Sequence, residues 1–345
     1  MQAIAKARPG QGLEIIDTPG PAPRGPSDVL IRVKKSGICG TDRHIYEWDA
    51  WAAERLKLPR VVGHEFVGVV EEVGPAVRSL RPGDRVTGEG HIGCGSCYSC
   101  RTGEAHVCQH VVLLGVDVDG AFAPRLLLPE SNVWKVDPAI PDDQACLFDP
   151  LGNAMHTVTA QPVTGRQVLI TGCGTIGLMA VAICRAAGAD LIIAADPMSE
   201  RRKLARKLGA DAVLEEASEP AVRKLTDRGG ADVLIEMSGS PRAVVEGLRC
   251  LRSGAHASLL GIPPGLVPVP LAELVIFKAL TLHGINGRRM FETWYRTESF
   301  LRRHPGLVEP LITHRLPFDR FEEGLRAMQE GRACKVILDW QKAKA

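Results

Sequence analysis

Four cysteines lie close together about one third of the way along the chain. They follow the spacing C-x2-C-x2-C-x7-C and are Cys94, Cys97, Cys100 and Cys108. Four thiolates at such short spacing complete the tetrahedral coordination of a structural zinc ion, which leaves no position open for a substrate. The spacing therefore predicts a zinc site that stabilises a loop. An iron–sulfur cluster and unliganded thiols are the alternatives.

A second group of potential metal ligands lies upstream. Cys39 occurs in the segment SGICGTDRH, and His64 and Glu65 occur in VVGHEF. A thiolate, an imidazole and a carboxylate from separate turns can form an open site, in which water or a substrate takes a remaining position. Taken singly, Cys39 could be a buried core thiol and His64 a core histidine. Their occurrence together, ahead of a nucleotide-binding motif, favours a catalytic metal.

That motif is the segment VLITGCGTIG, which places Gly172, Gly174 and Gly177 in the spacing G-x-G-x-x-G after an apolar run. In a dinucleotide site the first glycine makes a tight turn, the second lets the backbone approach the pyrophosphate, and the third lets helix and strand approach closely. Asp196 follows nineteen residues after Gly177, at the end of the next apolar run. Its carboxylate can accept hydrogen bonds from ribose hydroxyls and would repel a 2′-phosphate, so the motif predicts NAD as the cofactor.

The elements that must position these residues fall into three regions. Residues 1–150 contain short β-branched runs between glycines and prolines, which predict a β-rich, barrel-like domain. Residues 151–286 alternate apolar strands with helices, which predicts an α/β domain with a doubly wound parallel sheet. Residues 287–345 read as helix, strand, helix and strand, and the last strand has no partner in the α/β pattern. We expect this region to complete the first domain.

Composition and charge exclude several classes of protein. The chain has 345 residues, of which 45% are hydrophobic and 24% charged, and its formal net charge is +2. Without a long run of like charge, it is expected to bind neither nucleic acid nor an anionic membrane. The uncharged run of seventeen residues from Val168 to Cys184 is short for a membrane span and is broken by glycines.

The first residues, MQAIAKARPG, contain no apolar stretch of the kind found in secretion signals. We therefore expect a cytoplasmic protein. In a reducing compartment, clustered cysteines bind metal more often than they form disulfides.

These motifs resemble the zinc-dependent medium-chain alcohol dehydrogenase family. The segment GHEFVGVVEEVGPAVRSLRPGDRV is similar to that family's signature, and the four-cysteine segment is similar to its structural zinc lobe. The resemblance implies a GroES-like catalytic domain, a Rossmann domain, NAD, two zinc ions per chain and a homotetramer. By position it also implies that Cys39, His64 and Glu65 are the ligands of the catalytic zinc.

Further roles are implied by the same resemblance. Asp149 lies where relatives have a carboxylate beside the metal, so it is either a direct ligand or a group that acts through water or a proton relay. Thr41 and His44 would pass on the proton of the substrate. Cofactor contacts would involve Ile176, Asp196, Arg201, Leu260, Gly261, Ile262, Ile285 and Asn286. Pro124 and Arg125 stand where relatives usually have a glutamate and an aromatic residue.

Other segments, among them GICGTDRHIYEWDAWA and FDPLGNAMHT, are most similar to the family members that act on L-threonine. The implied reaction is the oxidation of its secondary hydroxyl to give L-2-amino-3-oxobutanoate, a step toward glycine. We expect His91 to recognise the ammonium or carboxylate group of the amino acid, although it could be a histidine that only caps the zinc loop. A polyol such as sorbitol or 2,3-butanediol is the alternative substrate.

Overall fold

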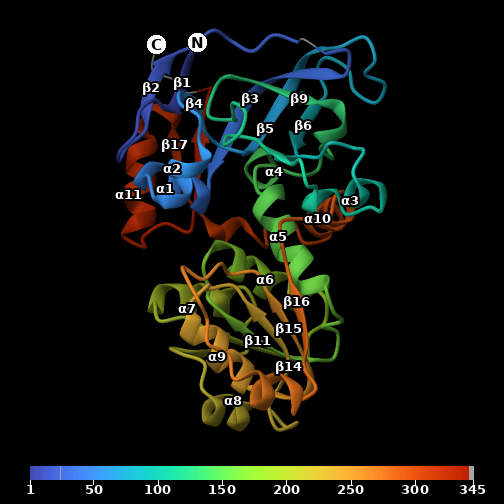
Figure 1. Ribbon diagram of the computed structural model, residues 1–345, viewed down its shortest axis with the longest axis vertical. Coiled ribbons are helices and arrows are strands. Elements are labelled where there is room, and N and C mark those ends of the chain that lie inside the picture. Colours follow the sequence, from blue (N-terminus) through green and yellow to red (C-terminus); the bar gives the residue numbers. More distant parts are fainter. Residues whose placement is uncertain (24, 342–345) are drawn as a thin grey trace. The chain divides into compact units, whose positions relative to one another are not determined.

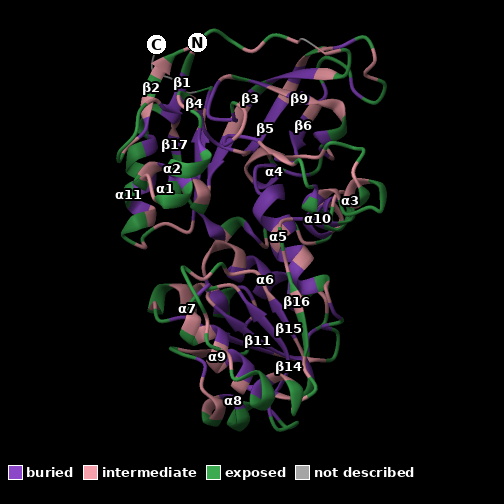
Figure 2. Cartoon of the chain, in the orientation of Figure 1, coloured by how far each residue is buried: buried purple, intermediate pink, exposed green. Residues whose placement is uncertain are grey.

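The computed structural model describes residues 1–23 and 25–341 (Figure 1). The described chain divides into two compact units. Unit 1 contains residues 1–149 and 312–341, and unit 2 contains Pro150–Leu311. In both units the strands are mostly buried and the exposed residues concentrate on helices and loops (Figure 2).

Unit 1 is built mainly from antiparallel β-sheet, and only β17 and β18 among the described strands of its two larger sheets pair in parallel. A small sheet has the order β2-β1-β4, and a larger sheet has the order β10-β6-β5-β3-β18-β17, with β9 paired to β3. The bounds are β1 Gln2–Lys6, β2 Glu14–Asp17, β3 Asp28–Ile38, β4 Arg60–Val61, β5 Glu65–Val73, β6 Arg85–Gly88, β9 Arg125–Pro129, β10 Val133–Lys135, β17 Ile312–Pro317 and β18 Lys335–Asp339.

The long strand β3 lies at the centre of the larger sheet, and β5, β9 and β18 all pair with it. Its apolar residues are buried, including three in succession from Val29 to Ile31, as expected for a strand with neighbours on both sides at the centre of a sheet. The last strand, β18, pairs with β3 so that Val336 faces Ile38. This register brings the end of the chain beside the segment that carries Cys39.

Short elements of unit 1 carry the candidate site residues. They are α1 Gly40–Glu47, α2 Ala50–Arg55, β7 His91–Ile92, α3 Tyr98–Arg101, η1 Ala105–Val107, β8 Val112–Leu113, η2 Glu130–Asn132, α4 Asp142–Ala145, η5 Phe318–Arg320 and α11 Phe321–Gln329. The α4 segment is tied to β3 by ion pairs from Lys34 to Asp142 and from Lys35 to Asp143.

Unit 2 contains a six-stranded sheet in which every neighbouring pair is parallel, with the order β13-β12-β11-β14-β15-β16. Its strands are β11 Gln167–Thr171, β12 Leu191–Ala195, β13 Ala212–Leu214, β14 Ala231–Glu236, β15 Leu251–Leu259 and β16 Thr281–Gly284. This order is that of a Rossmann fold. The predicted fold class, a β-rich domain with a doubly wound parallel sheet, is confirmed.

Helices flank this sheet (Figure 1). They are α6 Thr175–Ala186, α7 Ser199–Lys207, α8 Glu219–Leu225 and α9 Pro241–Arg249. Unit 2 also contains the π-helix η3 Ala272–Ile276, α10 Glu292–Arg303 and η4 Glu309–Leu311. The helix α5, Phe148–Thr159, begins just before the division between the units.

The chain returns to unit 1 at residue 312, later than the expected 287. Residues 287 and 288 are tied to α5 instead. His156 Nδ1 lies 2.9 Å from the carbonyl oxygen of Gly287, and Arg288 donates to Asn153 at 3.2 Å. The arginine stem also lies against Gly152.

Over residues 1–23 and 25–341, no helix has both the length and the apolar character needed to cross a membrane.

Candidate active site

Cys39, His64 and Glu65 come together in unit 1. One potential ligand atom from each lies within 4.8 Å of the other two. Cys39 is the N-cap of α1, where the positive end of the helix favours an anionic ligand. His64 and Glu65 stand at the start of β5, and Glu65 is fully buried. A soft sulfur, an imidazole and a carboxylate at this spacing fit zinc, and three ligands leave a coordination position for a substrate.

The charges around His64 fit a site built for a cation. Burial disfavours a charged imidazole, but the Cys39 sulfur, Asp42 and Asp149 outweigh this and raise the pKa of His64 to about 10. Burial raises the pKa of Asp42 to about 6, although His64 and the Cys39 amide act in the opposite direction. The negative charges that favour a proton on His64 would equally favour a metal cation at this position.

Asp42 is a buried residue to which sequence reasoning assigned no role. Its Oδ2 accepts the backbone N–H of Cys39 at 2.8 Å and so fixes the turn that presents the thiol. Its Oδ1 is buried, and among the described residues no hydrogen-bond partner for it is found. The position three residues after an N-cap is a capping-box position, which is the sequence signal that could have identified it.

The segment that carries His91 passes the metal group at the neighbouring residue, Gly90. A side chain at position 90 would lie 3.4 Å from the Cβ of His64 and 3.9 Å from Oδ2 of Asp149. Glu89, which is fully buried, accepts from the His91 amide at 2.9 Å and lies 3.0 Å from its Nδ1. The segment that carries His91 therefore runs past the metal ligands, with the ring held by a buried carboxylate.

Asp149 is buried near the metal group but is not one of the residues whose ligand atoms lie within 4.8 Å of one another. Its negative charge acts on both His64 and Lys335. The two roles considered for it, as a direct ligand or as a group that acts through water, both stay open.

Thr41 and His44 lie on α1, in the turns that follow Cys39. His44 Nδ1 is 2.7 Å from Oδ2 of Asp49, and Asp49 also caps α2 through the Ala52 amide at 2.9 Å. The imidazole is 61% exposed, so it can exchange protons with water.

The four cysteines of the loop 94–108 also come together, with all four sulfur atoms within 4.8 Å of one another. All ten cysteines, which fall within the described residues, are free thiols. The Cys97 and Cys108 sulfurs are 3.7 Å apart, and the amides of Cys94 and His110 donate to Cys108. Backbone donors of this kind stabilise thiolates around a zinc ion.

The acidity of these thiols is uneven. The amide and hydroxyl of Ser96 and the amide of Cys97 lower the pKa of Cys94 to about 5, whereas desolvation raises the pKa of Cys100 to about 12. The predicted structural zinc site fits this geometry.

The glycines of the predicted dinucleotide motif form the turn between β11 and α6 in unit 2. Gly172 has a φ of +87°, which favours glycine. A Cβ on Gly177 would lie 1.9 Å from the carbonyl oxygen of Gly172, so only glycine allows the helix to start this close to the turn. The helix N-terminus, with Gly174 as N-cap, leaves backbone amides for a phosphate.

Asp196 follows β12 and is buried. Its Oδ2 accepts from the Cys173 amide and its Oδ1 from the Met198 amide, at 2.8 and 2.9 Å. Arg201 lies 3.6 Å from Oδ2. The carboxylate is therefore held against the glycine-rich turn, and each oxygen keeps a lone pair that can accept from a ribose hydroxyl.

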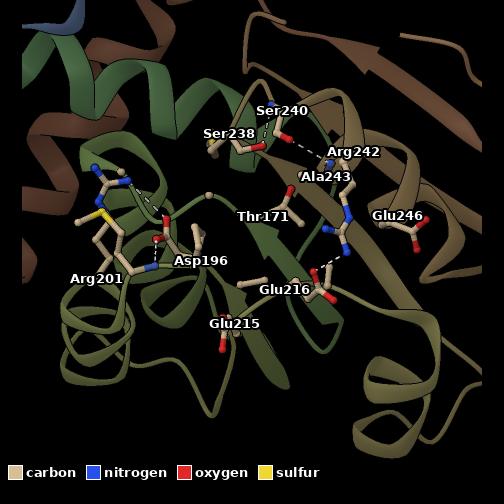
Figure 3. A pocket seen from close by; sticks show the side chains of 17 residues that line it. Thr171, Asp196, Arg201, Glu215, Glu216, Ser238, Ser240, Arg242, Ala243 and Glu246 are labelled. Carbon is tan, nitrogen blue, oxygen red and sulfur yellow. Dashed lines mark hydrogen bonds and ion pairs between the residues drawn. The ribbon is translucent and has the colours of Figure 1, made fainter. Parts of the chain in front are cut away.

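These residues border a cavity of about 470 Å³ that is lined by Gly172, Gly174, Asp196 and Arg201 among others (Figure 3). Glu215 and Glu216 lie across from the turn, and Arg242 pairs with Glu216 at 2.6 Å. The cavity stands at the carboxyl ends of parallel strands, where α/β sheets bind ligands. It fits the adenosine half of a dinucleotide.

The other predicted cofactor residues do not line this cavity but lie at the same ends of the strands. Ile176 is in the first turn of α6. Leu260, Gly261 and Ile262 follow β15, and the first two donate their amides to the carbonyl oxygen of Glu236. Ile285 donates to the carbonyl oxygen of Leu259, which places Ile285 and Asn286 beside them.

Glu236 is a further residue that sequence reasoning missed. It is fully buried at the end of β14, and its carboxylate accepts from the amides of Ser238 and Gly239 and from the Ser238 hydroxyl. It thereby holds the loop that borders the cavity. An acidic residue inside an otherwise apolar strand, DVLIEM, is the signal that could have revealed it.

Comparison with known proteins agrees with this geometry. Residues 25–138 match the alcohol dehydrogenase GroES-like domain, and residues 175–303 match the zinc-binding dehydrogenase domain. The L-threonine 3-dehydrogenase of Pyrococcus abyssi is 46% identical over 341 residues, which cover 98% of each chain. This chain belongs to the zinc-binding alcohol dehydrogenase family.

Two further relatives of this zinc-binding dehydrogenase support the assignment. The L-threonine 3-dehydrogenase of Deinococcus deserti is 45% identical, covering 99% of this chain and all of its relative. Among solved structures, the alcohol dehydrogenase TADH from Thermus sp. ATN1 has a TM-score of 0.90 at 30% identity, with 98% of this chain and 99% of that chain covered.

We expect Cys100→Ser to remove the structural zinc from this dehydrogenase. Because zinc held by four thiolates contributes folding free energy directly, the Tm should fall by on the order of 10 °C and the zinc content by one ion per chain. Differential scanning calorimetry and elemental analysis measure both quantities. Tyr98→Ala, at an exposed position of the same loop, is the control and should change neither. An unchanged Tm with unchanged zinc would show that the loop does not depend on the metal.

We expect NAD to be preferred over NADP because of the charge of Asp196. Asp196→Ser keeps an acceptor for the turn but removes that charge, so the ratio of kcat/KM for NADP to that for NAD should rise by about tenfold or more. Glu215→Gln, which also removes a charge from the cavity, is the matched control and should leave the ratio within about twofold. A parent enzyme that prefers NADP would contradict the assignment.

Proposed function

We propose that the protein is a zinc- and NAD-dependent L-threonine 3-dehydrogenase, which oxidises the secondary hydroxyl of L-threonine to give L-2-amino-3-oxobutanoate. The observation that carries the proposal is the open ligand group of Cys39, His64 and Glu65. The identity of about 45% to L-threonine 3-dehydrogenases over nearly the whole chain supports the choice of substrate.

Each cofactor supplies a defined part of the chemistry. Bound zinc lowers the pKa of the substrate hydroxyl, and NAD accepts the hydride. Cys39, His64 and Glu65 would hold the catalytic zinc, and the four-cysteine loop would hold a second zinc ion. The glycine-rich turn and Asp196 would hold the NAD.

The residues of α1 would remove the proton. Thr41 and His44 lie in the first and second turns of the helix whose N-cap, Cys39, is one of the proposed metal ligands. We infer that Thr41 receives the hydroxyl proton and that His44, exposed and oriented by Asp49, releases it to water. Asp149 would act on the same metal, either as a ligand or through water.

L-threonine must also be distinguished from a neutral alcohol. Its ammonium and carboxylate lose water in a closed site, and charged groups without partners are costly there. His91, whose ring is held by the buried Glu89 on the segment beside His64, would be one of these partners.

The proposal includes a cytoplasmic homotetramer. Thiolate metal sites need reduced cysteines, which the cytoplasm maintains. The sheet of unit 2 ends at β16, and large apolar side chains are exposed in the segment that joins β15 to β16. Ile262, Leu266, Ile276 and Phe277 are between 67% and 98% exposed. A subunit contact that covers this segment would support the assembly.

The reaction is tested by following NADH formation with L-threonine, D-threonine, sorbitol and 2,3-butanediol. We expect L-threonine to give the highest kcat/KM, and preference for a polyol would contradict the substrate assignment. Cys39→Ser should abolish turnover while the Kd for NAD stays within about twofold, because the metal site and the nucleotide cavity are built from different residues. Turnover near the parent level in Cys39→Ser would contradict the catalytic metal site.

His91→Asn is expected to lower kcat/KM for L-threonine by about tenfold to a hundredfold, the loss when a partner of a buried charged group is removed. The value for 2,3-butanediol should change less, because the diol has neither an ammonium nor a carboxylate. His110→Asn, at an exposed histidine near the same loop, is the control. An equal loss of kcat/KM on both substrates, or no loss on either, would show that His91 does not recognise the charged groups of the amino acid.

A further inference from the structure

Lys335, the first residue of β18, is buried beside the metal ligands, and its side chain is 3% exposed. Its Nζ donates to Oε1 and Oε2 of Glu65 at 2.9 and 2.7 Å and to the carbonyl oxygen of Ile38 at 3.0 Å. An ammonium group has three protons. All three are therefore used on one metal ligand and on the residue just before another.

The backbone leaves little room for the Glu65 carboxylate to move away. Gly37 pairs with Glu65 across β3 and β5. A Cβ at position 37 would lie 2.2 Å from Oε2 of Glu65. The carboxylate thus lies against the β3 backbone, within reach of Cys39 and His64 on one side and of Lys335 on the other. One buried carboxylate is shared between a lysine and the metal position.

This sharing matters for the acidity of the metal centre. The Cys39 thiolate and the Glu65 carboxylate together carry two negative charges, and Asp149 adds another nearby. Full donation from these groups would neutralise a divalent ion and weaken its effect on a bound hydroxyl. A lysine that holds Glu65 leaves more positive charge on the metal.

We propose that Lys335 is a positioning residue that limits how strongly Glu65 binds the catalytic metal and thereby keeps that metal a strong Lewis acid. The inference rests on the proposed function of Cys39, His64 and Glu65 as the catalytic zinc site. It assigns to the last strand of the chain a part in the chemistry of a site formed near its beginning.

Cobalt(II) in place of zinc gives a direct readout, because its visible d–d bands weaken when its coordination rises from four to five. We expect Lys335→Met to weaken these bands, because both oxygens of Glu65 are then free of the lysine and the second oxygen can also bind the metal. Zinc release to a chelator should slow by about tenfold or more, since a buried positive charge near the ion has been removed. Lys335→Arg, which keeps the charge, should stay within about twofold of the parent on both measures. Cobalt bound at the four-cysteine loop also absorbs. Its absorption is measured on Cys39→Ser loaded with cobalt in the same way and is subtracted from the spectra of the other proteins.

Two further variants test whether Lys335 acts on the metal through Glu65. In Lys335→Met/Glu65→Gln the parent band intensity should return, because the amide can bind the metal through only one oxygen. Lys335→Gln keeps a polar donor beside Glu65 and serves if the methionine variant does not fold; the same direction of change is expected.

Unchanged bands and unchanged zinc release in both neutral variants would overturn the inference, as would faster zinc release. If the parent itself takes up no cobalt at the Cys39 site, the proposed function has failed. Cobalt uptake by the parent with no effect of Lys335 contradicts this inference alone.

Discussion

The buried ion pair between Glu65 and Lys335 is the interaction on which unit 1 depends. It joins the start of β5 to the start of β18, two strands that both pair with β3 and that are separated by 270 residues along the chain. Burying two charges is costly unless each is paired and hydrogen-bonded. Here every proton of the ammonium has an acceptor. The return of the chain to its first sheet is thus coupled to the construction of the metal group.

Other buried carboxylates also hold segments of the two sites in place by hydrogen bonds. Asp42 fixes the turn of Cys39, Glu89 holds His91, Asp196 holds the glycine-rich turn, and Glu236 organises the loop after β14. In each case a carboxylate accepts from backbone amides or from a side chain that the site uses. The loops at both sites are therefore positioned by local hydrogen bonds, on strands that supply the rigid frame.

Much of the architecture could be predicted because its signals are local. Each of three signals depends on residues in one short stretch of the chain. They are the spacing of the four cysteines, the strand–glycine–helix motif and the acidic residue after the next strand. The alternation of strands and helices in residues 163–286 predicted the parallel sheet for the same reason. The grouping of Cys39 with His64 was predicted from their occurrence together ahead of the dinucleotide motif and from the family resemblance.

The residues that sequence reasoning missed depend on pairing between distant segments. Nothing near Lys335 indicates that β18 places it against Glu65, since the register with β3 decides this. The return of the chain at residue 312 rather than 287 depends on Arg288 and Gly287 meeting α5. Glu89 resembles an ordinary acid in the sequence, and only its full burial and its contacts with His91 show its role.

The central claim is that the group of Cys39, His64 and Glu65 binds the metal that oxidises the alcohol. The most direct measurement is to remove all metal from the protein and to add zinc back in known equivalents while NADH formation from L-threonine is followed. The account predicts no NADH without metal. It also predicts that the first equivalent mainly restores thermal stability, at the four-cysteine loop, and that the second restores turnover. Full turnover by the metal-free protein would contradict it.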